Sequence, residues 1–330
     1  METRPLGQTG IDATVIGLGT WNVGPVWEDA SDERVREAIR TALDEGVTFL
    51  DTAEVYGDGR AERLIGDVLA ERPDGDEIDV VTKAKPDPDG GHSESGLRAS
   101  VEGSLDRLGV DCLDLVQLHC PDTAAYYDPD VFDVLETLEA EGKIASAGVS
   151  VELIEQAQKA IEYDVVESVQ IIFNPLRLRP RERFFEAASA RDVGVIVRVP
   201  LASGLLADAF DAETTFEESD HRHAAIHEGV AAGVGTKGGE TFAGVPFEAG
   251  LAAVDALRPH VPEGQTMAQF TLRWILDHDA VTTVIPGSTT PEHVAENAAA
   301  AELSPLSHQT HGAVRDVYDE YVREHVHHRW

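Results

Sequence analysis

Short runs of apolar, often β-branched residues recur along the chain and alternate with longer stretches in which apolar residues return at helical spacing. This alternation is typical of βαβ units built around a parallel sheet. The predicted strands are VIGLG from 15, VTFLD from 47, IDVVTK from 78, CLDLVQLH from 112, KIASAGVS from 143, VESVQIIF from 166, GVIVRV from 194 and VTTVIPG from 281.

The stretches between these strands carry helix signals. Ser31 is placed to cap a helix that runs through DERVREAIRTALDEG, and Gly46 is placed to end it. Eight strands in strict alternation with helices favour a closed (β/α)8 TIM barrel, although a doubly wound sheet fits the same pattern. Further helices are predicted at 61–70, 93–108, 130–141, 152–162, 181–191, 265–277 and 291–301.

Three segments depart from the alternation. Residues 3–14 are expected to form a hairpin, an insertion occupies about 202–264 after the seventh strand with a helix-like stretch at 247–258, and about 303–330 form a C-terminal extension with one more helix. Insertions of this length are usually functional lids or binding loops, and this one would lie on the catalytic face of a barrel. We expect residues 1–330 to form a single barrel domain.

The chain is strongly acidic, with 61 Asp and Glu against 26 Lys and Arg and a formal net charge of −35. Such a field repels nucleic acid and anionic membranes, so neither is an expected partner. Self-repulsion also destabilises the compact state in dilute salt. We interpret the excess as a halophilic adaptation, because an acidic interaction tail would form a contiguous block of like charge and the sequence has none.

On this hypothesis, the thermal midpoint of unfolding should rise steeply between dilute buffer and about 1 M salt, where the Debye length falls to about 3 Å. Thermal melts followed by circular dichroism across a salt series measure the effect. A midpoint that does not change with salt would exclude the halophilic interpretation.

The two cysteines, Cys112 and Cys120, make neither a metal-binding spacing nor a disulfide framework, and we expect structural thiols in a reducing cytoplasm. The start of the chain lacks an apolar signal core, and no apolar run is long enough to cross a membrane. Histidines cluster in DHRHAAIH at 220–227 and HVHHRW at 325–330. We predict a surface loop and a surface tail there, and no metal site.

Polar residues stand where three consecutive predicted strands end. Asp51, Lys83 and His119 lie about one βα unit apart, so a barrel would bring them side by side at its C-terminal face. Tyr56 follows in the loop after Asp51, within DTAEVYGDG. Taken singly, each residue has a structural explanation, such as a helix cap, loop packing or a core histidine. Together they suggest catalysis.

The chemistry of this quartet fits a carbonyl reductase. A tyrosine with an ordinary pKa of about 10 can transfer a proton near neutrality when an ammonium group stabilises its phenolate. Lys83 would supply the ammonium, Asp51 would keep Lys83 charged, and His119 would hydrogen-bond the carbonyl oxygen. The hydride must then come from a cofactor.

Three segments resemble the signatures of the aldo-keto reductase superfamily, in its bacterial or archaeal type: DTAEVYGDGRAERLIGDVL, TKAK after a strand, and DLVQLHCPD. The resemblance spans the chain from GLGTWNVG to IPGSTTPEHVAENAAAAEL. It implies a barrel with a nicotinamide cofactor and reversible reduction of an aldehyde, ketone or sugar-like carbonyl. It also implies a catalytic tetrad of Asp51, Tyr56, Lys83 and His119.

The resemblance extends to the cofactor contacts. GVSVE is similar to the family's GVSN, with Val151 in place of an Asn, and Arg198 stands where the family often stacks an aromatic ring on the nicotinamide. LASGLL resembles the pyrophosphate cover. IPGSTTPEHVAEN resembles the adenosine end without the cations that commonly hold a 2′-phosphate, so NADP(H) is favoured with NAD(H) as the alternative. The implied contacts are Thr20, Trp21, Ser150, Gln170, Arg198, Leu201, Gly204, Leu205, Gly287, Ser288, Thr289, His293, Glu296 and Asn297.

The substrate is expected to be a small carbonyl compound in a pocket walled by Trp21, Asn22 and Trp27, although Trp27 has the alternative of packing a loop onto the barrel. A second hypothesis is a nicotinamide-binding regulatory module resembling potassium-channel β subunits, which share the fold and retain the tetrad. We favour the enzyme, because no N-terminal segment is appended and a strongly acidic surface is repulsive. A barrel lyase or hydrolase would not explain Ser150 and Gln170. The sequence indicates no oligomeric state.

Overall fold

The computed structural model describes residues 1–24, 30–235 and 238–330. Its main sheet has eight parallel strands in sequence order. Backbone bridges from Ile16 to Val284 and from Gly19 to Gly287 join the first strand to the last, so the sheet closes into the predicted (β/α)8 barrel. Each of the eight predicted strands is present: β3 (Leu18–Gly19), β4 (Phe49–Asp51), β5 (Asp79–Ala84), β6 (Leu115–His119), β7 (Ala147–Ser150), β8 (Ser168–Ile172), β9 (Gly194–Arg198) and β10 (Thr283–Val284).

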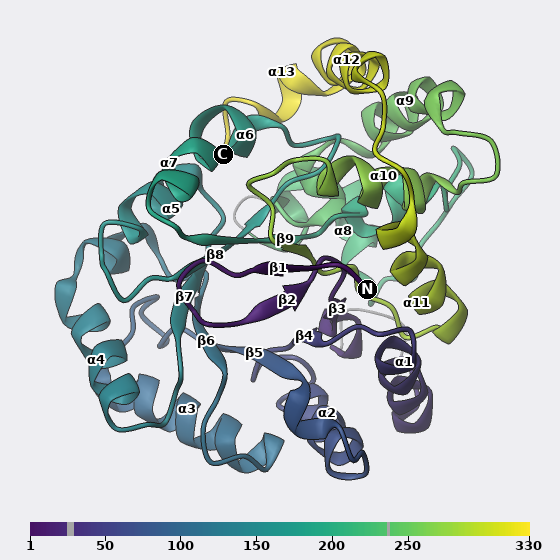
Figure 1. Ribbon diagram of the computed structural model, residues 1–330. Helices are drawn as coiled ribbons and strands as arrows, with labels where there is room; N and C mark the ends of the chain where they lie inside the picture. Colours follow the sequence, from purple (N-terminus) through teal and green to yellow (C-terminus); the bar gives the residue numbers. More distant parts are fainter. Residues whose placement is uncertain (25–29, 236–237) are drawn as a thin grey trace.

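Helices surround the barrel (Figure 1). The first begins as predicted, because the Ser31 side chain accepts a hydrogen bond from the Arg34 backbone N–H. The helix predicted at 181–191 is instead two helices that break at Phe184, a fully buried residue with non-helical backbone angles. The helices are α1 (Asp32–Asp44), α2 (Arg60–Ala70), α3 (Glu94–Leu108), α4 (Pro129–Ala140), α5 (Ile154–Ala160), α6 (Arg179–Arg183), α7 (Phe185–Ala190), α10 (Met267–Leu276) and α11 (Pro291–Ala298).

The predicted hairpin closes the N-terminal end of the barrel. Strands β1 (Thr3–Pro5) and β2 (Asp12–Thr14) pair antiparallel and lie across the centre of the view in Figure 1, in purple. Gly7 has a positive φ of 56°, and a Cβ there would collide with the Gly194 backbone at the start of β9. Hairpin and strand side chains share one buried cluster made of Leu6, Ile11, Ala13, Phe49, Val81, Leu115, Ile196 and Ile285.

The insertion after β9 is folded, with a small aromatic core of Phe210, Phe216, Phe242 and Phe247. The prediction of a surface loop at DHRHAAIH is wrong, because Asp220 caps a helix there and His221 is buried. The elements of the insertion are η4 (Ala202–Ala207), α8 (His221–His227), η5 (Val230–Ala232), η7 (Thr241–Gly244), α9 (Phe247–Leu257) and η8 (Arg258–His260).

The C-terminal extension contains the expected helix, α12 (His308–Val317), followed by a π-helical turn and α13 (Arg323–Val326). The prediction of a surface tail is wrong for its last residue. Trp330 is only 5% exposed and packs 4.1 Å from the guanidinium groups of Arg177 and Arg329. Arg177 also donates a hydrogen bond to the Gly239 carbonyl, so Trp330 packs on an arginine that joins the insertion to the segment after β8.

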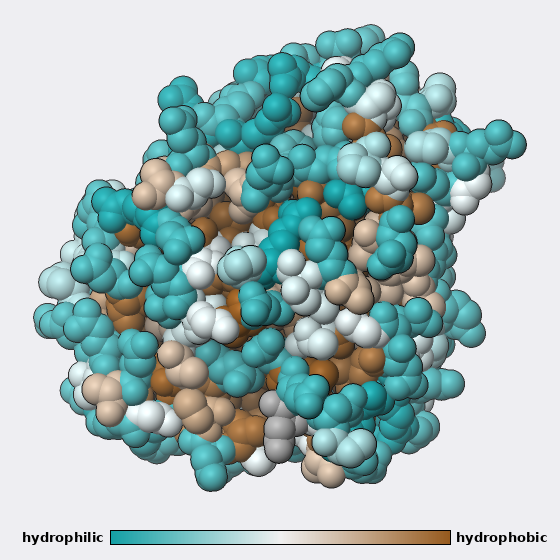
Figure 2. All heavy atoms as spheres, viewed as in Figure 1, coloured by the Kyte–Doolittle hydropathy of each residue, from teal (hydrophilic) through white to brown (hydrophobic). Residues whose placement is uncertain are grey.

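The face that carries the hairpin is covered mainly by hydrophilic side chains, with scattered hydrophobic ones (Figure 2). Across the described residues, every helix is too short or too polar to cross a membrane.

Candidate active site

Strand alternation explains why the predicted site residues share the barrel interior. Phe49 belongs to the cluster inside the barrel, whereas Leu50 packs outward against the helices. Asp51 therefore points inward again, at the C-terminal end of β4. By the same period of two, inward positions near the ends of the following strands are Lys83, His119, Ser150, Gln170 and Arg198.

A cavity of about 760 Å³ opens at this end of the barrel. It runs from the strand ends, beneath the insertion, to the segment between β10 and α11. The insertion therefore lies on the predicted face. The cavity brings together nearly all of the predicted residues: Trp21, Asn22, Asp51, Tyr56, His119, Ser150, Gln170, Arg198, Leu201, Gly204, Gly287, Ser288, Thr289, His293, Glu296 and Asn297.

Among the described residues, three predicted ones do not line this cavity. Lys83 lies behind Tyr56 and is 1% exposed. Thr20 is buried and donates its hydroxyl to the Asp51 carbonyl, 2.9 Å away, so it supports the site from behind. Leu205 is buried within η4, and Trp27 lies outside the described residues.

The quartet has the geometry of a proton-transfer site. The Lys83 ammonium donates to the Asp51 carboxylate at 2.7 Å, to the Thr52 carbonyl at 2.7 Å and to the Tyr56 hydroxyl at 3.4 Å. The rings of Tyr56 and His119 meet edge to face, with 5.8 Å between centroids. At the wall of the cavity, Tyr56 thus contacts a buried cation through its hydroxyl and an imidazole through its ring.

Burial decides the protonation states here. Burial, and then the Asp51 charge, raises the pKa of Tyr56 well above its ordinary 10.0, so the phenol is protonated near neutrality. Burial, and then the cations Lys83 and Arg198, lowers the pKa of His119 well below 6.5, so the imidazole is neutral and carries one N–H donor. Burial also lowers the pKa of Lys83 from 10.5, while Asp51 acts to raise it.

An amide network fixes the carboxylate of Asp51. The Gln170 amide group donates to Asp51 Oδ1 at 2.7 Å and to Gln117 Oε1 at 3.1 Å, and Gln117 donates to Ser168 at 3.2 Å. Both N–H groups of Gln170 are therefore engaged, which leaves its carbonyl oxygen to accept a hydrogen bond from a bound molecule.

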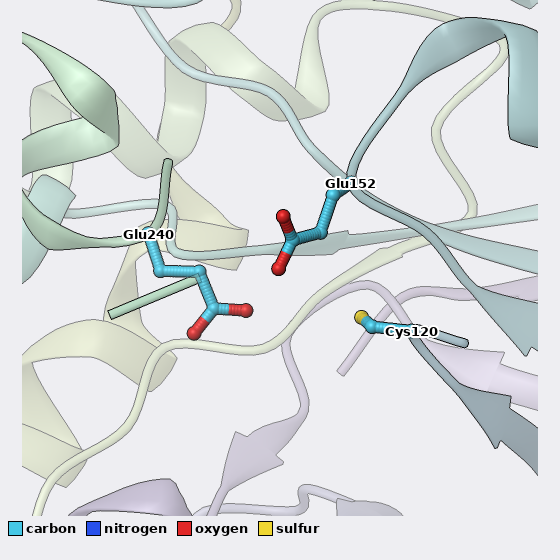
Figure 3. Close-up of side chains that lie close together, drawn as sticks. All are labelled: Cys120, Glu152 and Glu240. Carbon is cyan, nitrogen blue, oxygen red and sulfur yellow. The ribbon is translucent and has the colours of Figure 1, made fainter. Parts of the chain in front are cut away.

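Arg198 occupies a cluster that the sequence did not indicate. Its guanidinium donates to Glu240, contacts Cys120 Sγ at 3.7 Å and donates to the Val151 carbonyl at 3.1 Å. Figure 3 shows the side chains of Cys120, Glu152 and Glu240 converging on one space. Three such groups can bind a metal ion, but Arg198 already brings a positive charge to two of them. Arg198 thus forms an ion pair with Glu240 at the mouth of the barrel.

The insertion contributes site residues that the sequence did not indicate, because its stretch from 208 to 246 carries no periodic pattern or recognised motif. Glu240 pairs with Arg198, and the ring of the buried His221 lies 5.3 Å from that of Trp21. Arg222 lines the cavity together with Phe210 while its guanidinium is paired with Asp220 at 2.8 Å. Only the length of the insertion pointed to this role.

The far end of the cavity is lined by glycines at positions where a larger side chain would not fit. A Cβ on Gly287 would collide with the Asn22 side chain, and a Cβ on Gly19 would lie 2.9 Å from the Ile285 carbonyl. The hydroxyls of Ser288, Thr289 and Thr290 follow directly. This donor-rich, glycine-lined channel suits a dinucleotide better than a compact metabolite.

A protein-family model described as "Aldo/keto reductase family" matches residues 15–319. The aldo-keto reductase YhdN of Bacillus subtilis is 30% identical, over 88% of this chain and 86% of its own length. The NADH-specific methylglyoxal reductase of Escherichia coli is 26% identical, over 92% of this chain and 94% of its own length. A solved structure of an aldo/keto reductase from Klebsiella pneumoniae, in complex with NADP and acetate, is 25% identical with a TM-score of 0.71, over 96% of this chain and 95% of that one.

Proposed function

Because this chain belongs to the aldo/keto reductase family and is an NAD(P)-dependent oxidoreductase, we propose that it reduces an aldehyde, ketone or sugar-like carbonyl with Tyr56 as the general acid. The reaction is reversible. The observation that carries the proposal is the position of the Tyr56 hydroxyl, at the cavity wall and 3.4 Å from a lysine that is itself bound to Asp51. That arrangement supports proton transfer from the phenol.

Each member of the quartet has a role in the proton transfer. In the direction of reduction, Tyr56 Oη donates its proton to the carbonyl oxygen, and burial keeps that proton in place beforehand. The Lys83 ammonium stabilises the phenolate that forms, and Asp51 keeps Lys83 in position. The neutral His119 donates an N–H to the same carbonyl oxygen and orients it.

The cavity supports binding of a nicotinamide cofactor, which supplies the hydride when bound. The Gln170 carbonyl oxygen and Ser150 would hold the carboxamide next to Tyr56. LASGLL would cover the pyrophosphate, and the segment from Gly287 to Asn297 would hold the adenosine. NADP(H) is the proposed cofactor. The Klebsiella structure contains NADP, whereas the name of the E. coli relative specifies NADH.

The substrate would enter beside Trp21, Asn22 and Val55, all of which line the cavity, and Trp27 is proposed to complete this wall. We also propose a salt-rich cytoplasm as the setting, in which the full chain acts as one barrel domain. The free thiols of Cys112 and Cys120 suit a reducing compartment.

Fluorescence titration with NADPH and NADH in high-salt buffer, followed by turnover of a panel of aldehydes, tests the proposal. We expect saturable binding of the cofactor and oxidation of NADPH that depends on the aldehyde. Cofactor binding without turnover of any carbonyl would contradict the proposed enzymatic activity and favour a regulatory module. Failure to bind either nucleotide would overturn the proposal.

A further inference from the structure

An arginine from a distant part of the chain lies at the far end of the cavity. Arg34 is on α1, which packs beside α11 (Figure 1). Its Nε donates to the Thr289 carbonyl at 3.1 Å, and its Nη2 donates to the Thr290 hydroxyl at 2.7 Å. Both threonines line the cavity. The guanidinium therefore sits at the rim of the segment proposed to hold the adenosine.

No acid among the residues that the structure describes neutralises the charge of Arg34. Both of its acceptors are uncharged. The adjacent carboxylates on α1 are engaged by other arginines, Asp32 by Arg60 at 2.7 Å and Glu33 by Arg40 at 3.0 Å. Within residues 1–24, 30–235 and 238–330, no carboxylate lies within 4.0 Å of Arg34.

A guanidinium whose hydrogen-bond acceptors are uncharged can bind an anionic ligand. It has five N–H donors, and two hydrogen bonds hold one part of the group against Thr289 and Thr290, so further donors remain. Its side chain is solvent-exposed, so a phosphate can approach it. Paired donors of this kind bind phosphate oxygens with strong, charge-assisted hydrogen bonds.

The direction of the cavity indicates which phosphate this would be. The hydride donor must lie next to Tyr56, so the other half of a dinucleotide extends toward Ser288, Thr289 and Thr290. The remaining ionisable residues that line this end are His293 and Glu296. The Glu296 carboxylate would repel a phosphate. A dianion therefore needs a cation in reach, and the segment from Gly287 to Asn297 has neither lysine nor arginine.

We propose that Arg34 binds the 2′-phosphate of the adenosine ribose and thereby makes the enzyme prefer NADP(H) over NAD(H). The inference rests on the function proposed above. It assigns the cofactor preference to α1, whose Arg34 is 255 residues away in sequence from the threonine that it contacts.

Binding measurements on Arg34→Ala isolate this contribution. We expect the Kd of NADPH to rise about tenfold at moderate salt, the effect of losing one charge-assisted contact, while the Kd of NADH stays within about twofold. Competition titrations should show the same contrast for ligands that lack the nicotinamide. Arg34→Ala should weaken the binding of 2′,5′-ADP and leave the binding of 5′-ADP unchanged. Arg34→Lys, which keeps the charge, should retain part of the preference.

Arg36→Ala is the matched control, because Arg36 lies on the same helix and pairs with Asp67 at 2.8 Å, away from the cavity. It should leave all four dissociation constants unchanged. An Arg34→Ala variant with an unaltered NADPH-to-NADH ratio, or with equal losses for both nucleotides, would overturn the assignment. Wild-type protein that prefers NADH would overturn it and leave the reductase intact. Wild-type protein that binds neither nucleotide would overturn the function itself.

Discussion

Replacing Tyr56 with phenylalanine is expected to lower kcat for carbonyl reduction by about 10²- to 10⁴-fold, the contribution of a positioned general acid. Phenylalanine keeps the ring that packs against His119 and removes only the hydroxyl that Lys83 contacts at 3.4 Å. Binding of NADPH and the thermal midpoint should therefore change little. Steady-state kinetics and fluorescence titration on the same preparation measure both effects.

Tyr127→Phe is the matched control, because Tyr127 is 62% exposed and lies outside the cavity. It should retain wild-type kcat. A Tyr56→Phe variant with kcat within about threefold of the wild type would fall well short of a general acid's contribution and contradict the assignment. Loss of turnover accompanied by loss of cofactor binding would point to a structural role.

The predictable parts of this fold follow from local periodicity. The alternation of Phe49, Leu50 and Asp51 across one short strand places an acid inside the barrel, and the same pattern at later strands places Lys83 and His119 beside it. Parallel strands all end at the same face of the barrel. The spacing of strand-end residues along the sequence is therefore enough to predict that these residues lie close together. The proximity of these side chains was therefore predictable from the strand ends and from the resemblance.

The side-chain contacts that the sequence did not predict join segments that are distant in sequence. Arg34 looks like an ordinary polar residue on an amphipathic helix, and only the packing of α1 beside α11 brings it to Thr289. Glu240 sits in a part of the insertion without periodicity, and its role depends on Arg198. Trp330 appeared to belong to a polar tail, but cation–π contacts with two arginines bury it. Sequence spacing carries no signal for any of these pairings.

Replacing Lys83 with methionine should impair both catalysis and folding, for separate physical reasons. The phenolate of Tyr56 loses its stabilising cation, so kcat should fall by at least about 10²-fold. The Asp51 carboxylate, which is 2% exposed, loses its counter-ion at 2.7 Å, and breaking a buried pair in this way costs about 3–5 kcal/mol of unfolding free energy. Denaturant titration measures the second effect and steady-state kinetics the first.

The pH profile offers an independent check on Lys83. Burial lowers the pKa of Lys83 from 10.5, and the ammonium is the form that stabilises the phenolate. The rate of reduction should therefore fall as pH rises through that lowered pKa. Tyr56 should not cause this fall, because burial holds the pKa of its phenol well above 10.0. In Lys83→Met the basic limb should be absent, and only a low, flat rate should remain.

A double variant separates the two effects of Lys83. Asp51→Asn combined with Lys83→Met removes both charges and keeps an oxygen that can accept from Gln170, so it should regain much of the lost stability without regaining kcat. Lys85→Met is the control for the substitution itself, because the Lys85 side chain is exposed and its ammonium lies 3.4 Å from Glu54. The buried Glu54 carboxylate keeps its hydrogen bonds from Ser100 and from the backbone N–H of residue 85, so the cost should stay at about 1 kcal/mol. If the double variant recovered wild-type kcat, the buried pair would serve packing alone, and Tyr56 would have to transfer its proton without a neighbouring cation.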